Sequence, residues 1–117
     1  MNFSDKTWCD EFPSAITICN KEGIILYMNN KSCATFANDG GEKLIGANVL
    51  DCHPEPSRNK LKKMLSEGKT NSYTIEKNGI KKLIHQSPWF ENGEYNGFVE
   101  FSFEIPFKMP HFIRDKK

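Results

Sequence analysis

The sequence predicts an α+β domain with an antiparallel sheet and short helices gathered in the middle of the chain. Two observations predict this class: β-rich runs joined by short turns occur at both ends, and helical patterns lie between them. A third is the length, because 117 residues suit one domain with a single core. We expect a flanking helix within residues 1–12, one domain over 13–106 and a basic tail over 107–117.

The first predicted element is a short helix from Ser4 to Phe12. Ser4 or Asp5 would cap it, and Trp8 lies four residues before Phe12, so the two rings share one face. Pro13 ends the helix because it disfavours helical backbone in the residue before it. The aromatic face of this helix could cover one side of the sheet.

Two β-rich runs follow, Ala15–Cys19 and Ile24–Met28, and the polar turn Asn20–Gly23 joins them. A short polar loop that ends in Gly favours an antiparallel hairpin. The next two residues, Asn29–Asn30, can cap a helix that would carry Phe36 on its apolar side. The unit therefore predicts strand, turn, strand and capped helix.

Short helical pieces and one longer helix are predicted next. The segment Asn38–Gly41 breaks the first helix, and one further turn is expected over Glu42–Ile45. Two prolines, Pro54 and Pro56, exclude a regular helix interior before Ser57.

The longer helix is predicted over Ser57–Glu67, with its first residue as the N-cap. Leu61, Met64 and Leu65 form its apolar stripe. Gly68 stands where a left-handed C-cap is expected.

The rest of the chain is predicted to be β-structure. The turn Lys77–Gly79 contains Asn-Gly, the strongest short hairpin signal, and joins the strands Asn71–Glu76 and Ile80–Phe90. In the last strand, Val99, Phe101, Phe103 and Ile105 alternate with Glu100, Ser102 and Glu104. This alternation predicts that the first set is buried and the second faces water.

Composition limits the partners and the location. Sixteen Lys and Arg nearly balance fifteen Asp and Glu, so the charge gives no reason to expect nucleic acid or an anionic membrane as the partner. No apolar run is long enough to span a bilayer, and the first residues lack the pattern of a signal peptide. We expect a cytoplasmic protein whose four scattered cysteines are free thiols.

Three segments, in this order, resemble the PAS family. They are FPSAITICNKEGIILYMNN, EKLIG and SPWFENGEYNGFVEFSFEI. The resemblance extends over roughly Trp8 to Ile105. It implies five antiparallel strands in the order 2-1-5-4-3, with helices that cross one face and enclose a small pocket.

The resemblance also implies a function. PAS domains sense and relay signals, some with a ligand in the pocket and others as dimerisation modules. We therefore expect a non-enzymatic sensor or interaction domain, either stand-alone or a piece of a larger protein. It would form a homodimer through the sheet and the Ser4–Phe12 helix, and would contact a signalling protein.

Eight residues are candidates for the pocket, and the ligand is left open as a small metabolite or haem. The candidates are Phe36, Cys52, His53, Leu61, Leu65, His85, Trp89 and Phe101. His53 could ligate haem, because histidine is a common haem ligand. The alternative, which we favour, is a loop histidine that hydrogen-bonds locally. Strand parity leaves the direction of His85 open.

Other chemistries find less support in the sequence. Cys52 is followed by His53 and Pro54, and lacks the flanking motif of light-sensing flavin domains, so flavin photochemistry is not expected. Cys52, His53 and His85 have no recognised metal-site spacing, so we predict no metal. A small enzyme with a cysteine thiolate remains a third hypothesis.

Overall fold

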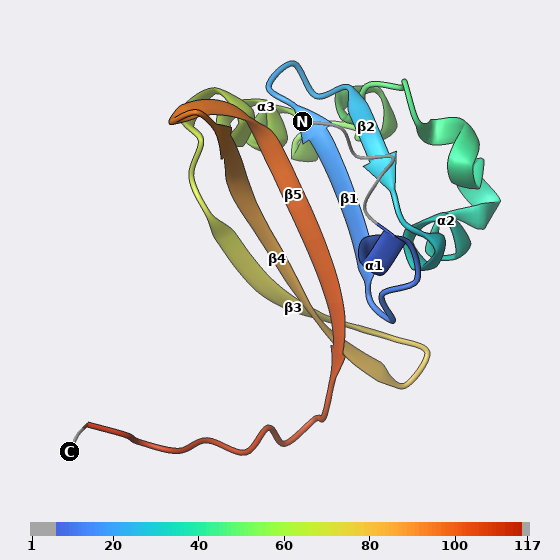
Figure 1. Ribbon diagram of the computed structural model, residues 1–117. Helices are drawn as coiled ribbons and strands as arrows, with labels where there is room; N and C mark the ends of the chain where they lie inside the picture. Colours follow the sequence, from blue (N-terminus) through green and yellow to red (C-terminus); the bar gives the residue numbers. More distant parts are fainter. Residues whose placement is uncertain (1–6, 116–117) are drawn as a thin grey trace.

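The computed structural model describes residues 7–115, apart from the side chains of Thr7 and Cys52. A five-stranded antiparallel sheet runs through this part of the chain in the predicted order, β2-β1-β5-β4-β3. Its strands are β1 (Ala15–Asn20), β2 (Ile25–Met28), β3 (Asn71–Lys77), β4 (Ile80–Glu91) and β5 (Glu94–Ile105). The central strand of the sheet is therefore the last one in the sequence (Figure 1).

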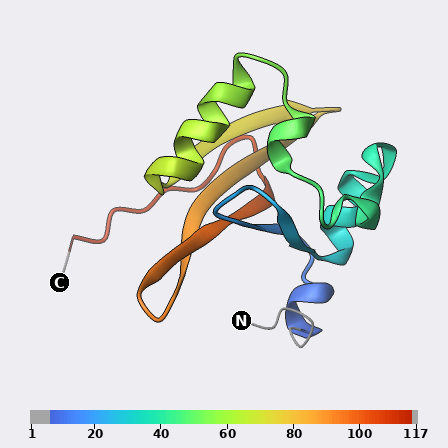
Figure 2. The ribbon, with the colours of Figure 1, turned by 90° about the horizontal axis from the view of Figure 1, so that it is seen from above.

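The helices lie mainly on one face of the sheet. They are α1 (Thr7–Asp10), α2 (Asn30–Thr35), the 3-10 turns η2 (Ala37–Asp39), η3 (Gly41–Leu44) and η4 (Val49–Cys52), and α3 (Ser57–Glu67). Seen from above, α3 crosses one face of the sheet and α1 lies on the opposite side (Figure 2). The sheet thus has an inner face toward α3 and an outer face toward α1.

The first hairpin forms as predicted, with one change at the start of β2. The side chain of Asn20 accepts hydrogen bonds from the backbone N–H of Glu22 at 3.1 Å and of Ile24 at 2.9 Å, which closes the turn. Ile24 lies outside β2 because it pairs with Asn48 in an isolated bridge. Asn29 caps α2, since its side chain accepts a hydrogen bond from the backbone N–H of Ser32.

The N-terminal helix ends two residues earlier than predicted. Its predicted caps, Ser4 and Asp5, lie outside the described residues, and the helix ends at Asp10. The predicted aromatic contact is present, because the rings of Trp8 and Phe12 meet edge to face with centroids 6.1 Å apart. Phe12 therefore reaches Trp8 from beyond the helix end.

The long helix α3 begins and ends at the predicted residues, but its cap differs. Ser57 is the first helical residue and not the N-cap; the cap position is held by Pro56, whose side chain makes no cap hydrogen bond. The carboxylate of Glu55 instead accepts from the backbone N–H of Asn59 at 3.1 Å. Gly68 ends the helix with φ at 64°, in the left-handed region as predicted.

On the last strand, the side that faces the cavity is not the one predicted to be buried, although Glu104 is exposed as predicted. Phe98 is only 6% exposed and packs on the inner face with Leu65, and Glu100, two residues on, shares that face. Phe101 and Phe103 lie on the outer face, where their rings stack with centroids 5.5 Å apart. Aromatic side chains occur at both parities of this strand, so the sequence pattern did not distinguish the face that α3 covers.

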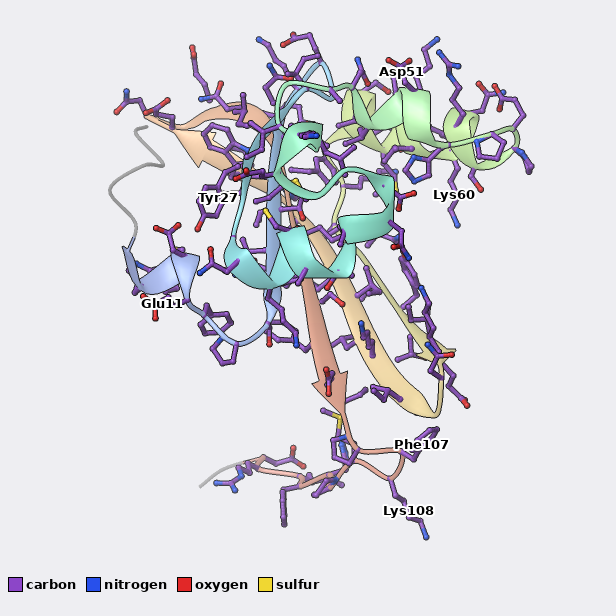
Figure 3. The ribbon with its side chains drawn as sticks, turned by 90° about the vertical axis from the view of Figure 1, so that its right-hand side faces the viewer. Glu11, Tyr27, Asp51, Lys60, Phe107 and Lys108 are labelled. Atoms are coloured by element: carbon purple, nitrogen blue, oxygen red, sulfur yellow. The ribbon has the colours of Figure 1, made fainter. Side chains whose placement is uncertain are left out.

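After β5, residues 106–115 contain no helix or strand. This segment leads away from the sheet, and Phe107 and Lys108 lie beyond the strand end (Figures 1 and 3). No helix in residues 7–115 has both the length and the apolar character that crossing a membrane requires.

Candidate ligand-binding cavity

A cavity of about 620 Å³ lies between the inner face of the sheet and the helical segments. All five strands, α3, the 3-10 turns and neighbouring loop residues contribute to its lining. The lining residues are Thr17, Cys19, Ile25, Met28, Phe36, Asp39, Leu44, Val49, His53, Leu61, Met64, Leu65, Tyr73, Ile75, Ile84, Gln86, Phe98 and Glu100. Its size lies within the range of small-molecule sites, roughly 300–1,000 Å³.

The walls of the cavity are mostly apolar because α3 turns its apolar stripe toward the sheet. Leu61, Met64 and Leu65 pack from the helix toward Cys19 and Phe98 on the strands. The 3.6-residue period of the helix places these three side chains on one face, while the intervening lysines remain exposed. An apolar molecule in the cavity would therefore contact apolar side chains of α3.

A chain of polar side chains crosses the sheet on the inner face. Asn71 on β3 donates a hydrogen bond to the side-chain oxygen of Gln86 on β4 at 3.1 Å. Gln86 in turn donates from Nε2 to Oε2 of Glu100 on β5 at 2.7 Å. Strand pairing sets this chain, because Asn71 and Glu100 are both direct register partners of Gln86.

Glu100 brings negative charge into a half-buried position. Among residues 7–115, no Lys, Arg or His forms an ion pair with it. Burial raises the pKa of the Tyr73 hydroxyl, and the charge of Glu100 raises it further. Burial also raises the pKa of the Cys19 thiol, with a smaller contribution from Glu100, and a hydrogen bond from the backbone of Phe98 opposes the rise. The charge of Glu100 therefore disfavours a negative charge on these two neighbouring side chains.

His53 lines the cavity from the segment just after η4. Its Nδ1 lies 2.7 Å from the backbone oxygen of Val49, which can only accept, so Nδ1 carries the proton. In the neutral ring, Nε2 is then the acceptor. The ring is exposed and makes a local hydrogen bond, as expected for a loop histidine in the interpretation favoured over a haem ligand.

The eight sequence-predicted candidates separate into three groups. Phe36, His53, Leu61 and Leu65 lie in the cavity lining. The side chain of Cys52 lies outside the described part of the structure.

Three candidates lie on the outer face of the sheet, so their prediction as lining residues is corrected. His85 contacts the Ser72 hydroxyl at 2.6 Å through Nδ1, and Phe101, its register partner on β5, stacks on Phe103. Trp89 donates from its indole nitrogen to the backbone oxygen of Cys19 at 3.0 Å. The physical reason is the period of two along a strand: all three positions have the parity opposite to that of Ile84, Gln86 and Phe98.

Sequence reasoning missed the polar residues of the cavity. Glu100 reads as a solvent-facing residue between two aromatics, and Gln86 carries no motif. The predicted strand order does place β5 between β1 and β4. In the structure, Glu100 is the register partner of both Thr17 on β1 and Gln86 on β4. Turn lengths alone do not fix that register, because β1 and β5 are far apart in the sequence.

His53 and His85, for which the sequence predicts no metal site, lie on opposite faces of the sheet. His53 lies at the cavity, on the inner side, and His85 lies on the outer face. Within the described residues, no three His, Cys, Asp or Glu side chains gather in a way that could hold a metal ion.

Comparison with known proteins gives matches only among solved structures. No protein-family model matches the sequence, and no curated protein matches it significantly. A C-terminal domain from Streptococcus mutans is 20% identical and has a TM-score of 0.68; the match covers 84% of this chain and 80% of that one.

Two further matches are described as PAS proteins. The PAS domain of an HTR-like protein from Haloarcula marismortui is 16% identical, with a TM-score of 0.60 over 85% of this chain and 87% of that one. The Aer2 receptor from Vibrio cholerae, described as a dual PAS-heme oxygen sensor, is 15% identical, with a TM-score of 0.61 over 80% of this chain and 95% of that one. At these identities the likeness is one of fold.

Proposed function

From the PAS fold of this chain we propose that it is a sensor and interaction domain that binds a small molecule in the cavity beneath α3. The observation that supports this most is the cavity itself. It combines an apolar wall on α3 with a fixed line of polar groups on the sheet, which is the usual composition of a ligand site.

A ligand can reach the cavity from the side of β3. Tyr73 and Ile75 are cavity-lining residues of this edge strand, yet they are 45% and 38% exposed. In contrast, the lining residues Phe98 and Leu65 are buried. The lining thus has exposed residues at β3 and buried apolar residues at α3 and β5.

The relay would pass through the sheet to its outer face. Cys19 and Phe98 are register partners on the inner face, and their neighbours Ile18 and Val99 are register partners on the outer face. A ligand that shifts the first pair also moves the backbone that carries the second pair. We propose that this outer face, with α1, binds a second copy of the chain or a signalling partner.

Ligand binding is tested by ¹H–¹⁵N correlation spectra of the full chain with mixtures of small metabolites. The proposal expects shifts at the amides of Leu65, Ile84 and Phe98. A Leu61→Trp variant, which fills the cavity from α3, should lose these shifts, while Lys60→Trp on the exposed side of the same helix should keep them. Shifts confined to surface residues, or equal in both variants, would contradict the proposal.

Haem is a second candidate ligand, favoured by one observation. The hydrogen bond from Nδ1 of His53 to Val49 leaves Nε2 as the acceptor nitrogen, as in many metal-ligating histidines. Against it, the described cavity lining contains no Lys or Arg that could pair with haem propionates. Titration with haemin decides the point: a Soret shift that His53→Ala abolishes supports haem, and a shift unaffected by the mutation excludes His53 as its ligand.

We propose no catalytic role for the chain. Burial raises the pKa of the Cys19 thiol, which is the opposite of what a thiolate nucleophile needs. Thiol titration against pH tests the remaining cysteine hypothesis, which concerns Cys52. A thiol at Cys52 that reacts with an ordinary pH profile fits the proposal, and one that reacts as a thiolate at low pH contradicts it.

A further inference from the structure

We propose that the ligand of the cavity is a small apolar amine, and that the carboxylate of Glu100 binds its protonated nitrogen. This inference rests on the proposed function and names the chemical class of the ligand. It follows from the position of Glu100, from the charges of the lining and from the shape of the apolar wall.

The carboxylate of Glu100 is held in place on the sheet. Its Oε2 accepts from Gln86 at 2.7 Å, and Gln86 is itself held by Asn71 at 3.1 Å. No other donor in residues 7–115 hydrogen-bonds to Glu100, so Oε1 is left to accept from a ligand. A fixed carboxylate with an open oxygen is suited to an ammonium group, because such charge-assisted hydrogen bonds are the strong ones.

The charges around Glu100 favour a cation. Asp39 adds a second carboxylate at the exposed rim, and the described lining contains no Lys or Arg. A protonated amine would supply the cationic partner that Glu100 lacks within residues 7–115. Glu100 also disfavours the anionic forms of Tyr73 and Cys19, and it would disfavour an anionic ligand in the same way.

The rest of the cavity favours an apolar body. Leu61 and Leu65 from α3 and Ile84 and Phe98 from the sheet all line the cavity. A volume of about 620 Å³ accommodates an aromatic or branched aliphatic group of modest size. An amine with such a group would place its charge at Glu100 and its carbon skeleton against α3.

Three matched probes test the charge preference: 3-phenylpropylamine, 3-phenylpropanol and 3-phenylpropanoate. Each is titrated into the full chain at neutral pH and followed by ¹H–¹⁵N correlation spectra. We expect the amine to shift the amides of Gln86, Glu100 and Leu65 and to bind at least about tenfold more tightly than the propanoate. Added salt should weaken the binding of the amine and leave the binding of the alcohol unchanged, because salt screens only the charge interaction.

Glu100→Gln removes the charge and keeps the shape and the hydrogen bond to Gln86. This variant should lower the affinity for the amine by about tenfold, since one charge-assisted hydrogen bond is lost, and should change the affinity for the alcohol little. Glu104→Gln is the matched control, because it removes the same charge from an exposed position of the same strand outside the cavity. This control should leave the amine affinity unchanged.

The outcomes separate this inference from the proposed function. Two results would overturn the amine inference while the sensor function stands. In both, metabolites bind in the cavity; in the first the propanoate binds as tightly as the amine, and in the second none of the three probes binds. Unchanged amine affinity in Glu100→Gln also overturns the inference. If no metabolite and no probe shifts the lining amides, both proposals are wrong.

Discussion

Asn29 is the residue that ties the N-terminal segment to the sheet and to α2. It is 1% exposed, and its Oδ1 accepts from the backbone N–H of Ile16 and of Ser32, both at 2.9 Å. Its Nδ2 donates to the backbone oxygens of Cys9 at 3.0 Å and Ser14 at 2.9 Å. One buried amide thus satisfies backbone groups of three segments.

Replacing Asn29 with Ala should lower the free energy of unfolding by about 2–4 kcal/mol, because a helix cap is lost and buried backbone groups are left unpaired. Urea unfolding measures this. Asn38→Ala, at an exposed asparagine, is the control and should change stability by less than about 0.5 kcal/mol. Equal losses of stability in the two variants would show that the hydrogen bonds of the buried Asn29 amide do not stabilise the fold.

Tyr27 links α1 to β2 and makes stability depend on alkaline pH. Its hydroxyl donates to the carboxylate of Asp10 at 2.5 Å. Burial raises its pKa, and the hydrogen bond and the negative charge of Asp10 raise it further. In the unfolded chain, tyrosine ionises near pH 10, at about its ordinary value. The stabilising contribution is therefore fully present below that pH and is lost as the pH rises toward the folded pKa.

Tyr27→Phe should flatten the fall in stability at alkaline pH. Above about pH 10, the unfolded wild type releases the Tyr27 proton first, so the free energy of unfolding falls by up to about 1.4 kcal/mol per pH unit from this group. Urea unfolding of wild type and variant between about pH 8 and about pH 11 measures the difference in slope. Tyr73 and Tyr95, whose pKa values are also raised, keep a slope in both proteins. Parallel curves would contradict the assignment.

Among the elements, β1 and β5 approach closely at Gly97. A Cβ atom there would lie 2.0 Å from the backbone oxygen of Cys19, and the φ angle of Gly97 is 145°. Trp89, the register partner of Gly97, reaches past it to donate to that same oxygen. The absence of a side chain thus permits both the strand pairing and the indole hydrogen bond.

Gly97→Ala should destabilise the protein by about 3 kcal/mol, because backbone atoms must move to admit the methyl group. Gly93→Ala is the control: its φ is also positive, at 81°, but nothing lies within 4 Å of the new atom. It should cost about 1 kcal/mol from backbone strain alone. Urea midpoints compare the two, and similar losses would mean that close approach at Gly97 has no energetic role.

Local signals predicted elements well. The turn at Asn78 and Gly79 has positive φ at both residues, 54° and 78°, which is what Asn-Gly favours. The bounds of α3 follow from its apolar stripe and from Gly68. The cap of α3 was missed because the carboxylate that provides it, Glu55, lies beyond a proline, outside the usual cap position.

The candidate site was only partly predictable, because its parts depend on long-range pairing. Leu61 and Leu65 follow from the helical period, which one segment reveals. The direction of Phe101 and Glu100 depends instead on which face of β5 α3 covers, and both parities of that strand carry aromatic side chains. Only the assembled sheet places Glu100 beside Gln86 and thereby identifies a charge in the cavity.

At the scale of the whole molecule, the account predicts self-association through the outer face. Light scattering after size-exclusion chromatography should show a dimer, and Phe101→Asp should shift it toward monomer, since a charge then replaces an apolar contact. Ile80→Asp, at the exposed first residue of β4, is the control and should leave the dimer intact. A wild type that remains monomeric at high concentration would contradict association through this face.

The central claim is that the cavity beneath α3 binds a small molecule, and a ¹H–¹⁵N titration of the full chain with metabolite mixtures tests it most directly. The account predicts saturable shifts at the amides of Leu65, Ile84 and Phe98, followed by shifts at Val99 on the outer face of the sheet. Spectra in which no lining amide moves with any mixture would contradict the claim.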